Sequence, residues 1–127
     1  MAPTEKLNIA FMNIRGQTGL TLTKQMQIED YIRNNRIDIL HLQESNIVED
    51  TFIDCKLISS SYNIIANNSP TKYGTASLVK NEFEVKNVAM DSEGRVIIFE
   101  VGGITCGNLY MQSGTDAMSR EKGALFL

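Results

Sequence analysis

Short apolar runs recur along the chain, and their spacing predicts the secondary structure of its first third. Residues 7–13 (LNIAFMN) are apolar at both alternating positions, a pattern typical of a strand buried on two sides. A helix is expected from Thr21 or Thr23 to about residue 34, and residues 37–43 (IDILHLQ) form a second apolar strand. The helix gathers its apolar positions on one side: Met26, Ile28, Tyr31 and Ile32. The first 44 residues therefore predict a β-α-β crossover between parallel strands.

After residue 44 the pattern changes to short segments, rich in β-branched residues, that are separated by turn signals. Gly102 and Gly103 lie between two such segments and predict a two-residue hairpin, and residues 91–94 predict a tight connection. A last helix would open at Thr115 or Asp116, and the chain ends inside it without a stop signal, which indicates a truncated domain. The expected strands are 62–67, 74–80, 84–90, 95–101 and 104–111, and the apolar positions of the last helix are Met118, Ala124, Leu125 and Phe126.

Composition limits the classes of protein that this chain can represent. Its 127 residues, 43% of them apolar, fit one domain or part of one. A net charge of −3 argues against a dedicated nucleic-acid coat protein, whose affinity would come mostly from basic residues, but is compatible with a nuclease that holds a metal with carboxylates. No apolar run is long enough to span a membrane, and the N-terminus lacks the apolar region of a secretory signal. Cys55 and Cys106, far apart, are expected to be buried and reduced in an intracellular protein.

Two polar residues stand at the carboxyl ends of the first two predicted strands. Asn13 has the parity of Leu7, Ile9 and Phe11, and Glu44 has the parity of Asp38, Leu40 and Leu42. If those apolar residues face the core, an amide and a carboxylate meet at its rim, where parallel strands gather ligands. One carboxylate with an amide oxygen suits Mg²⁺, which fills its octahedron with water and substrate phosphate. The alternative is that both are solvated strand ends.

The other candidate residues have simpler interpretations. His41 fits a packed strand histidine with a satisfied hydrogen bond better than a catalyst. With one histidine and no cysteine pair at metal spacing, the sequence argues against a zinc site. Arg15 and Arg95 flank glycines at strand ends, where they could reach phosphates or be ordinary surface arginines. Ser113 lacks the Gly-x-Ser-x-Gly context of a serine nucleophile, and Gly102-Gly103 lacks that of a phosphate loop.

Four segments, read in order, resemble the motifs of the endonuclease/exonuclease/phosphatase superfamily. They are FMNIRG at 11–16, IDILHLQES at 37–45, GTASLV at 74–79 and NLYMQSG at 108–114. The resemblance covers nearly the whole chain, and its spelling, Ser113-Gly114 above all, looks most like the apurinic-type endonuclease domain of non-LTR retrotransposons. It implies a two-sheet α/β sandwich like that of DNase I, with the site at one end between the sheets.

The resemblance also implies the chemistry. Members hydrolyse phosphodiesters with Mg²⁺ or Mn²⁺, so Glu44 would be the metal ligand with Asn13 beside it. Tyr110 would bond the scissile phosphate or assist catalysis, and Ser113 would lie near the phosphate backbone together with the candidate arginines, Arg15 and Arg95. DNA would be the substrate of the complete domain, and the nucleus is a plausible location.

Two departures from the family pattern qualify this interpretation. Gln112 stands where the family usually has proline, and no residues correspond to the motifs of the family's second half, including its histidine base. We therefore expect the N-terminal half of such a domain, nearly inactive alone. Its uncovered sheet face would need the missing half or self-association, and the residues expected there are Leu7, Ile9, Phe11, Leu40, Leu42 and Leu109. A superfamily phosphatase acting on a small phosphoester or phospholipid headgroup, or a non-catalytic interaction module, remain as alternatives.

Overall fold

Seven strands form two sheets in the computed structural model, which describes residues 6–15, 19–68 and 74–111. The larger sheet has the order β1-β2-β4-β3, with β1 (Ile9–Asn13), β2 (Ile39–Gln43), β3 (Tyr62–Asn67) and β4 (Thr75–Lys80). The smaller sheet has the order β5-β6-β7, with β5 (Val85–Met90), β6 (Val96–Val101) and β7 (Ile104–Leu109). Two helices, α1 (Leu22–Asn35) and α2 (Lys56–Ser61), complete the described part. None of its helices is long and apolar enough to cross a membrane.

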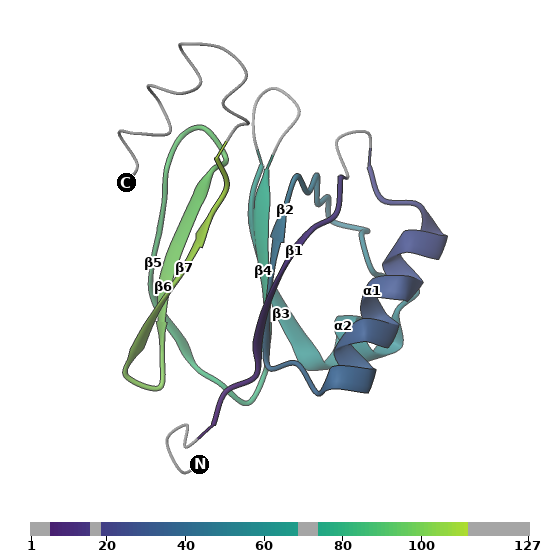
Figure 1. Cartoon of the computed structure of the whole chain (residues 1–127), viewed down its shortest axis with the longest axis horizontal. Coiled ribbons are helices and arrows are strands. Elements are labelled where there is room, and N and C mark those ends of the chain that lie inside the picture. The colour runs from purple at the N-terminus through teal and green to yellow at the C-terminus, as the bar shows by residue number, and fades with distance from the viewer. Residues whose placement is uncertain (1–5, 16–18, 69–73, 112–127) are drawn as a thin grey trace.

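The molecule has three layers, because the larger sheet lies between the helices and the smaller sheet (Figure 1). One apolar core fills the space between the helices and the larger sheet, and it includes Ile28, Ile32, Leu40, Leu42 and Leu78. A second core lies between the two sheets, and it includes Ile39, Val79, Ile97, Phe99 and Val101. The chain thus contributes strands to both sheets of the sandwich, which fits half of a DNase I-like fold. The opposing layer that the sequence predicts to be missing is present in part, because the smaller sheet covers β2, β3 and β4.

Helix α1 forms as its sequence pattern predicts. The side chain of Thr21 caps it by accepting a hydrogen bond from the backbone N–H of Lys24 at 3.2 Å. Ile28 and Ile32, one turn apart, are buried against the sheet, whereas Met26 and Tyr31 of the same predicted side are exposed. The helix returns the chain to β2, which pairs with β1 in parallel and so confirms the crossover.

Strand β1 differs from the expected strand buried on two sides. It is an edge strand of the larger sheet, and Phe11 is 60% exposed and Ile9 40% exposed. Leu40 and Leu42 were expected on an uncovered face and are instead fully buried under the helices. Leu109 is 41% exposed, but it lies on the outer face of the smaller sheet and not on the inner face where the sequence predicts it, and Leu7 is half-buried. The sequence pattern missed the helical side of the sheet because β2 is buried on both faces.

The remaining strands agree with the prediction to within two residues at each end. Val101 pairs with Ile104 across Gly102 and Gly103, whose φ angles of 56° and 80° are those of the predicted hairpin turn. Helix α2 was not predicted because it has only six residues, among them three serines. The carboxylate of Glu29 in α1 holds the first turn of α2 by accepting a hydrogen bond from the backbone N–H of Leu57 at 2.9 Å. The expected C-terminal helix lies outside the described residues.

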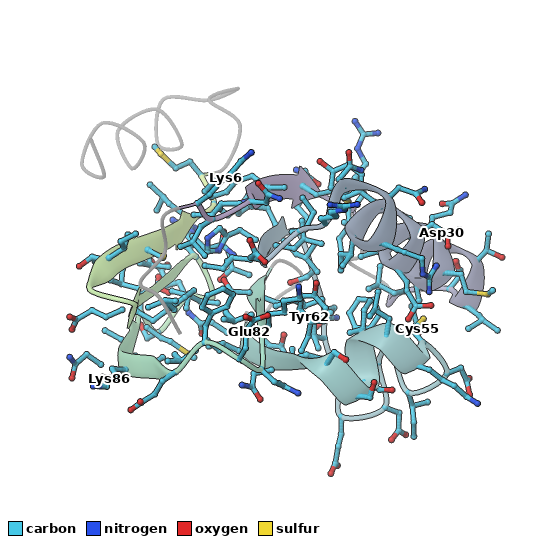
Figure 2. The ribbon with its side chains drawn as sticks, turned by 90° about the horizontal axis from the view of Figure 1, so that it is seen from below. Lys6, Asp30, Cys55, Tyr62, Glu82 and Lys86 are labelled. Atoms are coloured by element: carbon cyan, nitrogen blue, oxygen red, sulfur yellow. The ribbon has the colours of Figure 1, made fainter. Side chains whose placement is uncertain are left out.

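In the view from below, both sheets run from the side of the molecule that carries Lys6 to the side that carries Lys86 (Figure 2). Figure 2 shows Lys6, which precedes β1, and Lys86 of β5 on opposite sides. Strands β1 and β7 lie together on the side of Lys6, as the view in Figure 1 also shows. Both are edge strands, each the last of its sheet on that side.

Candidate functional site

Asn13 and Glu44 stand at the same end of the larger sheet. In the parallel pairing of β1 with β2, Asn13 is the register partner of Gln43, which immediately precedes Glu44. The N–H of Ile14 donates to the carbonyl of Gln43 at 3.0 Å and extends this pairing to the end of the strands. Glu44 itself has a φ of 52°, so the strand geometry ends there and the chain turns. The two predicted residues are therefore brought to one rim.

The parity argument behind that prediction is wrong in one respect. Phe11 and Asn13 lie on the face of the larger sheet that is turned toward the smaller sheet, in register with His41 and Gln43, whereas Leu42 faces the helices. The apolar residues that share the parity of Glu44 thus belong to the other face of the sheet. Parallel register and the left-handed turn at Glu44, not a shared face, place Glu44 beside Asn13.

A buried polar network joins the two sheets next to this rim. Asn108 of β7, fully buried, accepts from Nε2 of Gln43 at 2.9 Å and donates to the carbonyls of Leu42 and Ala76 at 3.2 and 2.9 Å. Its amide also donates to Oγ of Ser77 at 3.3 Å. Because every polar group of Asn108 has a partner, the network holds β7 at one position against β2 and β4.

Ser77 extends the network to His41. Oγ of Ser77 and Nδ1 of His41 form a hydrogen bond of 2.7 Å, and both residues are buried. The ring of His41 stacks on Phe11 with centroids 4.6 Å apart. Burial lowers the pKa of His41 to about 4, so the imidazole is neutral at pH 7. His41 is thus a packed, hydrogen-bonded residue, as predicted.

The turn between β5 and β6 brings Arg95 and Tyr110 to the same end of the sandwich. The backbone N–H of Tyr110, which follows β7, donates to the carbonyl of Arg95 at 2.8 Å. Tyr110 is half-buried. Arg95 is 9% exposed, and its guanidinium lies 3.9 Å from the carboxylate of Glu93. The phosphate contact predicted for Arg95 stays a prediction, and Ser113 lies outside the described residues.

Asp91 organises this turn. Its Oδ1 accepts from the N–H groups of Arg95 and Val96 at 2.9 and 3.0 Å and from Nδ2 of Asn67 at 2.9 Å. Burial by itself would raise the pKa of Asp91, but the hydrogen bonds that these groups donate to the carboxylate lower the pKa below its usual range. Since Asn67 ends β3, the bonds of Asp91 also tie the turn to the larger sheet.

Ser45 and Gly74 fill the rim behind Glu44. The N–H of Ser45 donates to the carbonyl of Gly74 at 3.0 Å, and a Cβ at Gly74 would stand 2.6 Å from the Ser45 carbonyl oxygen. Only glycine fits this approach. Ser45 is fully buried, and its Oγ has no hydrogen-bond partner within the described residues. A buried hydroxyl without a partner, next to Glu44, marks this rim as a place where a polar ligand fits.

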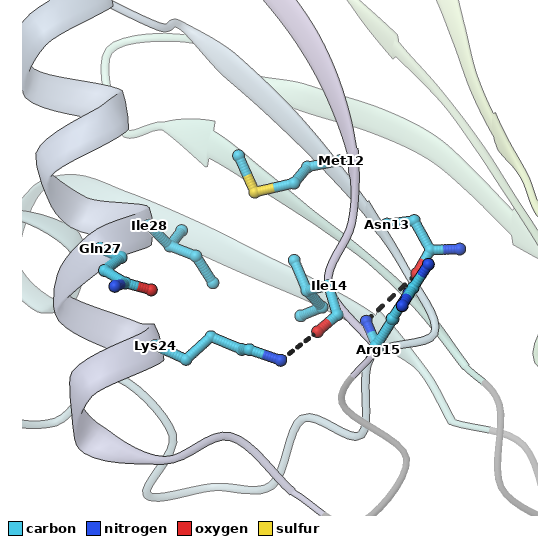
Figure 3. Close-up of a pocket in the computed structure, with 7 residues that line it drawn as sticks. All are labelled: Met12, Asn13, Ile14, Arg15, Lys24, Gln27 and Ile28. Carbon is cyan, nitrogen blue, oxygen red and sulfur yellow. Dashed lines mark hydrogen bonds between the residues drawn. The ribbon is translucent and has the colours of Figure 1, made fainter.

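A cleft of about 290 Å³ opens between the end of β1 and α1 (Figure 3). It is lined by residues 12–15 and by Lys24, Gln27 and Ile28. Nζ of Lys24 donates to the carbonyl of Ile14 at 2.6 Å, and the N–H of Arg15 donates to Oδ1 of Asn13 at 3.1 Å. Figure 3 shows Asn13 and Arg15 on the side of β1 turned away from the helix. Two cationic residues, Lys24 inside the cleft and Arg15 on its outer rim, thus flank the end of β1 next to Asn13, which favours an anion there.

The donor set at the rim fits a hard cation of low protein coordination. A carboxylate from Glu44 and the amide oxygen of Asn13 are oxygen ligands, and Mg²⁺ is commonly bound by one or two carboxylates with water completing its shell. Within the described parts of the chain, no group of three or more His, Cys, Asp or Glu residues could hold a metal ion. The described residues therefore offer no site of the zinc type, in which three or four such side chains bind the metal.

The cysteines take no part in the site. Cys55 and Cys106 are both buried and unbridged, as predicted. Burial raises the pKa of both thiols, and the nearby carboxylates of Glu29, Asp54 and Asp30 add to the increase at Cys55. Neither sulfur is therefore activated as a nucleophile.

Sequence reasoning missed the residues that support the rim. Gln43, Ser77 and Asp91 were not singled out, although each makes a contact that links segments far apart in the chain. One signal was available, because Ser77 interrupts the apolar run of Ala76, Leu78 and Val79 in β4. A polar residue in the middle of a buried strand indicates a buried hydrogen-bond partner.

The fold is that of the AP endonucleases and related DNA-processing phosphoesterases. An AP endonuclease from Archaeoglobus fulgidus matches 95% of this chain with a TM-score of 0.74 and 20% identity, and the chain covers 48% of it. A 3′ phosphatase, NExo, from Neisseria, bound to a product DNA hairpin, matches 95% with a TM-score of 0.73 and 21% identity, with 49% of it covered. A truncated TDP2 from Caenorhabditis elegans matches 86% with a TM-score of 0.60 and 25% identity, with 47% of it covered.

The chain thus spans about half the length of these solved structures. No protein-family model and no curated protein matches its sequence. The structural similarity supports the endonuclease/exonuclease/phosphatase fold to which the sequence motifs pointed.

Proposed function

We propose that this chain is the N-terminal half of a metal-dependent endonuclease domain that nicks DNA, of the retrotransposon type. The observation that carries the proposal is the meeting of Asn13, Glu44 and Tyr110 at one end of a sandwich with the fold of an AP endonuclease. The retrotransposon assignment rests on the spelling of the NLYMQSG motif at 108–114. DNA as substrate is supported by the similar NExo structure, which is bound to a product DNA hairpin.

In this proposal, Glu44 and Asn13 hold Mg²⁺ or Mn²⁺ at the rim. The ion would neutralise charge that develops on the phosphate during in-line attack by water. Tyr110 would donate a hydrogen bond to the scissile phosphate from the opposite sheet. Arg15 and Lys24, in the cleft beside Asn13, would hold the neighbouring backbone phosphates.

Catalysis also needs a base to deprotonate the attacking water, and this chain has no suitable histidine. His41 is its only histidine, and it is neutral, buried and hydrogen-bonded to Ser77. We therefore expect DNA nicking near background from this chain alone, and the residues of a complementary half would supply the base.

Metal binding tests the site without requiring activity. Mn²⁺ binding to the purified chain, followed by the loss of the electron paramagnetic resonance signal of the free ion, should weaken roughly tenfold or more in Glu44→Gln. Glu82→Gln is the matched control, because Glu82 is an exposed acid beyond β4 at the opposite end of the sandwich. Equal Mn²⁺ binding by the wild type and Glu44→Gln would overturn the assignment of Glu44.

DNA binding tests the cleft separately. The anisotropy of a labelled duplex should show a several-fold weaker complex for Arg15→Ala and no change for Lys86→Ala, since Lys86 is an exposed lysine of β5 on the other side of the molecule. Hydrolysis of a small phosphate ester together with no binding of DNA would instead favour the alternative phosphatase.

A further inference from the structure

The two sheets are offset, and the offset leaves part of the larger one uncovered. Strands β3, β4 and β2 all contact the smaller sheet, with β2 and β4 facing β7. Strand β1 lies one strand farther out, beyond the edge made by β7. Its inner face is therefore exposed, which explains why Phe11 is 60% exposed although its ring stacks on the buried His41.

The backbones of β1 and β7 also have a free edge on this side. Asn8 and Ile14 direct their backbone groups toward β2, so those of the alternate residues Ile9, Phe11 and Asn13 point away from it. By the same alternation, the bond from Tyr110 to Arg95 directs Thr105, Gly107 and Leu109 away from β6. Within the described residues, β1 pairs only with β2, and β7 only with β6.

We propose that two copies of this chain associate about a two-fold axis parallel to these strands, so that β1 of each copy pairs with β7 of the other. The rotation places the larger sheet of one copy in the same layer as the smaller sheet of the other. Strand β1 of each copy, which extends one strand beyond its own smaller sheet, then occupies the space next to β7 of the other copy. Each layer would join the four strands of one copy to the three of the other. Phe11 of one copy would face Phe11 of the second across the axis, and both exposed rings would become buried.

Shape and charge favour a second copy as the occupant. The overhang of β1 and the gap beside β7 belong to the same molecule and are each one strand wide, so the edge of one copy is complementary to that of another. A two-fold axis also brings like residues together, which like charges would oppose. Neither β1 (IAFMN) nor β7 (ITCGNL) contains a charged residue, although edge strands are commonly protected by charges.

Analytical ultracentrifugation of the purified chain tests the proposal. We expect the wild type to have the mass of a dimer at micromolar concentration. In Phe11→Lys we expect association to be weaker by roughly tenfold or more, because the axis places two lysines together in a buried position. Ile98→Lys is the matched control: Ile98 is 41% exposed and lies on the outer face of the smaller sheet, so this variant should remain a dimer. Circular dichroism and cooperative urea unfolding confirm that each variant is folded.

Cross-linking gives a second readout that does not depend on a loss of association. Phe11→Cys should form a covalent dimer with a short bifunctional maleimide, and Ile98→Cys should not, while the native Cys55 and Cys106 are buried. A monomeric wild type would overturn the proposal. So would dissociation by Ile98→Lys with Phe11→Lys still dimeric, or covalent dimers of Ile98→Cys alone.

Discussion

Gln43 donates a hydrogen bond to Asn108 at 2.9 Å, and this bond connects the two sheets beside the candidate site. Gln43 directly precedes Glu44, and Asn108 stands two residues before Tyr110. The relative positions of the candidate metal ligand and the candidate phosphate ligand therefore depend on a contact between two amides. A residue with no proposed role in chemistry thus positions residues that have one.

Replacing Asn108 should destabilise the protein strongly. Asn108→Ala removes four side-chain hydrogen bonds and leaves the carbonyls of Leu42 and Ala76 without that partner inside the sandwich. We expect a loss of about 2–4 kcal/mol in the free energy of unfolding, measured by urea titration. Asn63→Ala, at an exposed position of β3, should change it by about 0.5 kcal/mol or less. Similar losses in both variants would contradict the role of the network.

Gly74 should not tolerate even a methyl group. A Cβ there meets the backbone oxygen of Ser45 at 2.6 Å, so β4 or the segment after β2 must shift. Gly74→Ala should lower the unfolding free energy by about 1–3 kcal/mol. It should also weaken the binding of Mn²⁺, because Ser45 adjoins Glu44. Gly107→Ala is the natural comparison, since a Cβ at Gly107 has no atom within 4 Å, and it should be nearly neutral.

His41 should make stability depend on pH between about 4 and 6.5. Its folded pKa is lowered to about 4 by burial, whereas the unfolded chain binds a proton near the ordinary value of 6.5. Stability is therefore complete above the unfolded pKa and is lost as the pH falls toward the folded pKa, by at most about 3 kcal/mol. Urea midpoints at several pH values should show a smaller decrease for His41→Gln. As the chain has one histidine, an unchanged decrease would exclude His41 as its source.

Asp91 should stabilise the folded protein in its charged, deprotonated form, whereas His41 does so in its neutral form. Its pKa is lowered in the folded protein, so its contribution is present above the ordinary carboxyl range and is lost as the pH falls through the folded pKa. At pH 7, Asp91→Ala should lower the unfolding free energy by about 1–2 kcal/mol, through the bonds to Arg95, Val96 and Asn67. Asp54→Ala, at an exposed position, is the control. A deficit that persists undiminished in strong acid would contradict this mechanism.

Local patterns in the sequence determined most of the secondary structure. The helical spacing of Ile28 and Ile32, the cap at Thr21 and the glycine pair 102–103 are short-range signals, and each produced the predicted element. The strand-end placement of Asn13 and Glu44 was likewise readable, because a crossover helix imposes parallel strands whose carboxyl ends share one edge. These features follow from neighbours within a few residues and from the handedness and reach of the chain.

Tertiary structure decided which face of each strand is covered. A strand such as β2, which is buried on both faces, has no solvent-exposed side that reveals its orientation, so Leu40 and Leu42 could be assigned to either core until the helices were placed. The overhang of β1 and the pairing of Gln43 with Asn108, 65 residues apart, depend equally on how the two sheets stack. Such contacts join segments whose local patterns are independent of one another, so only the packed chain brings them together.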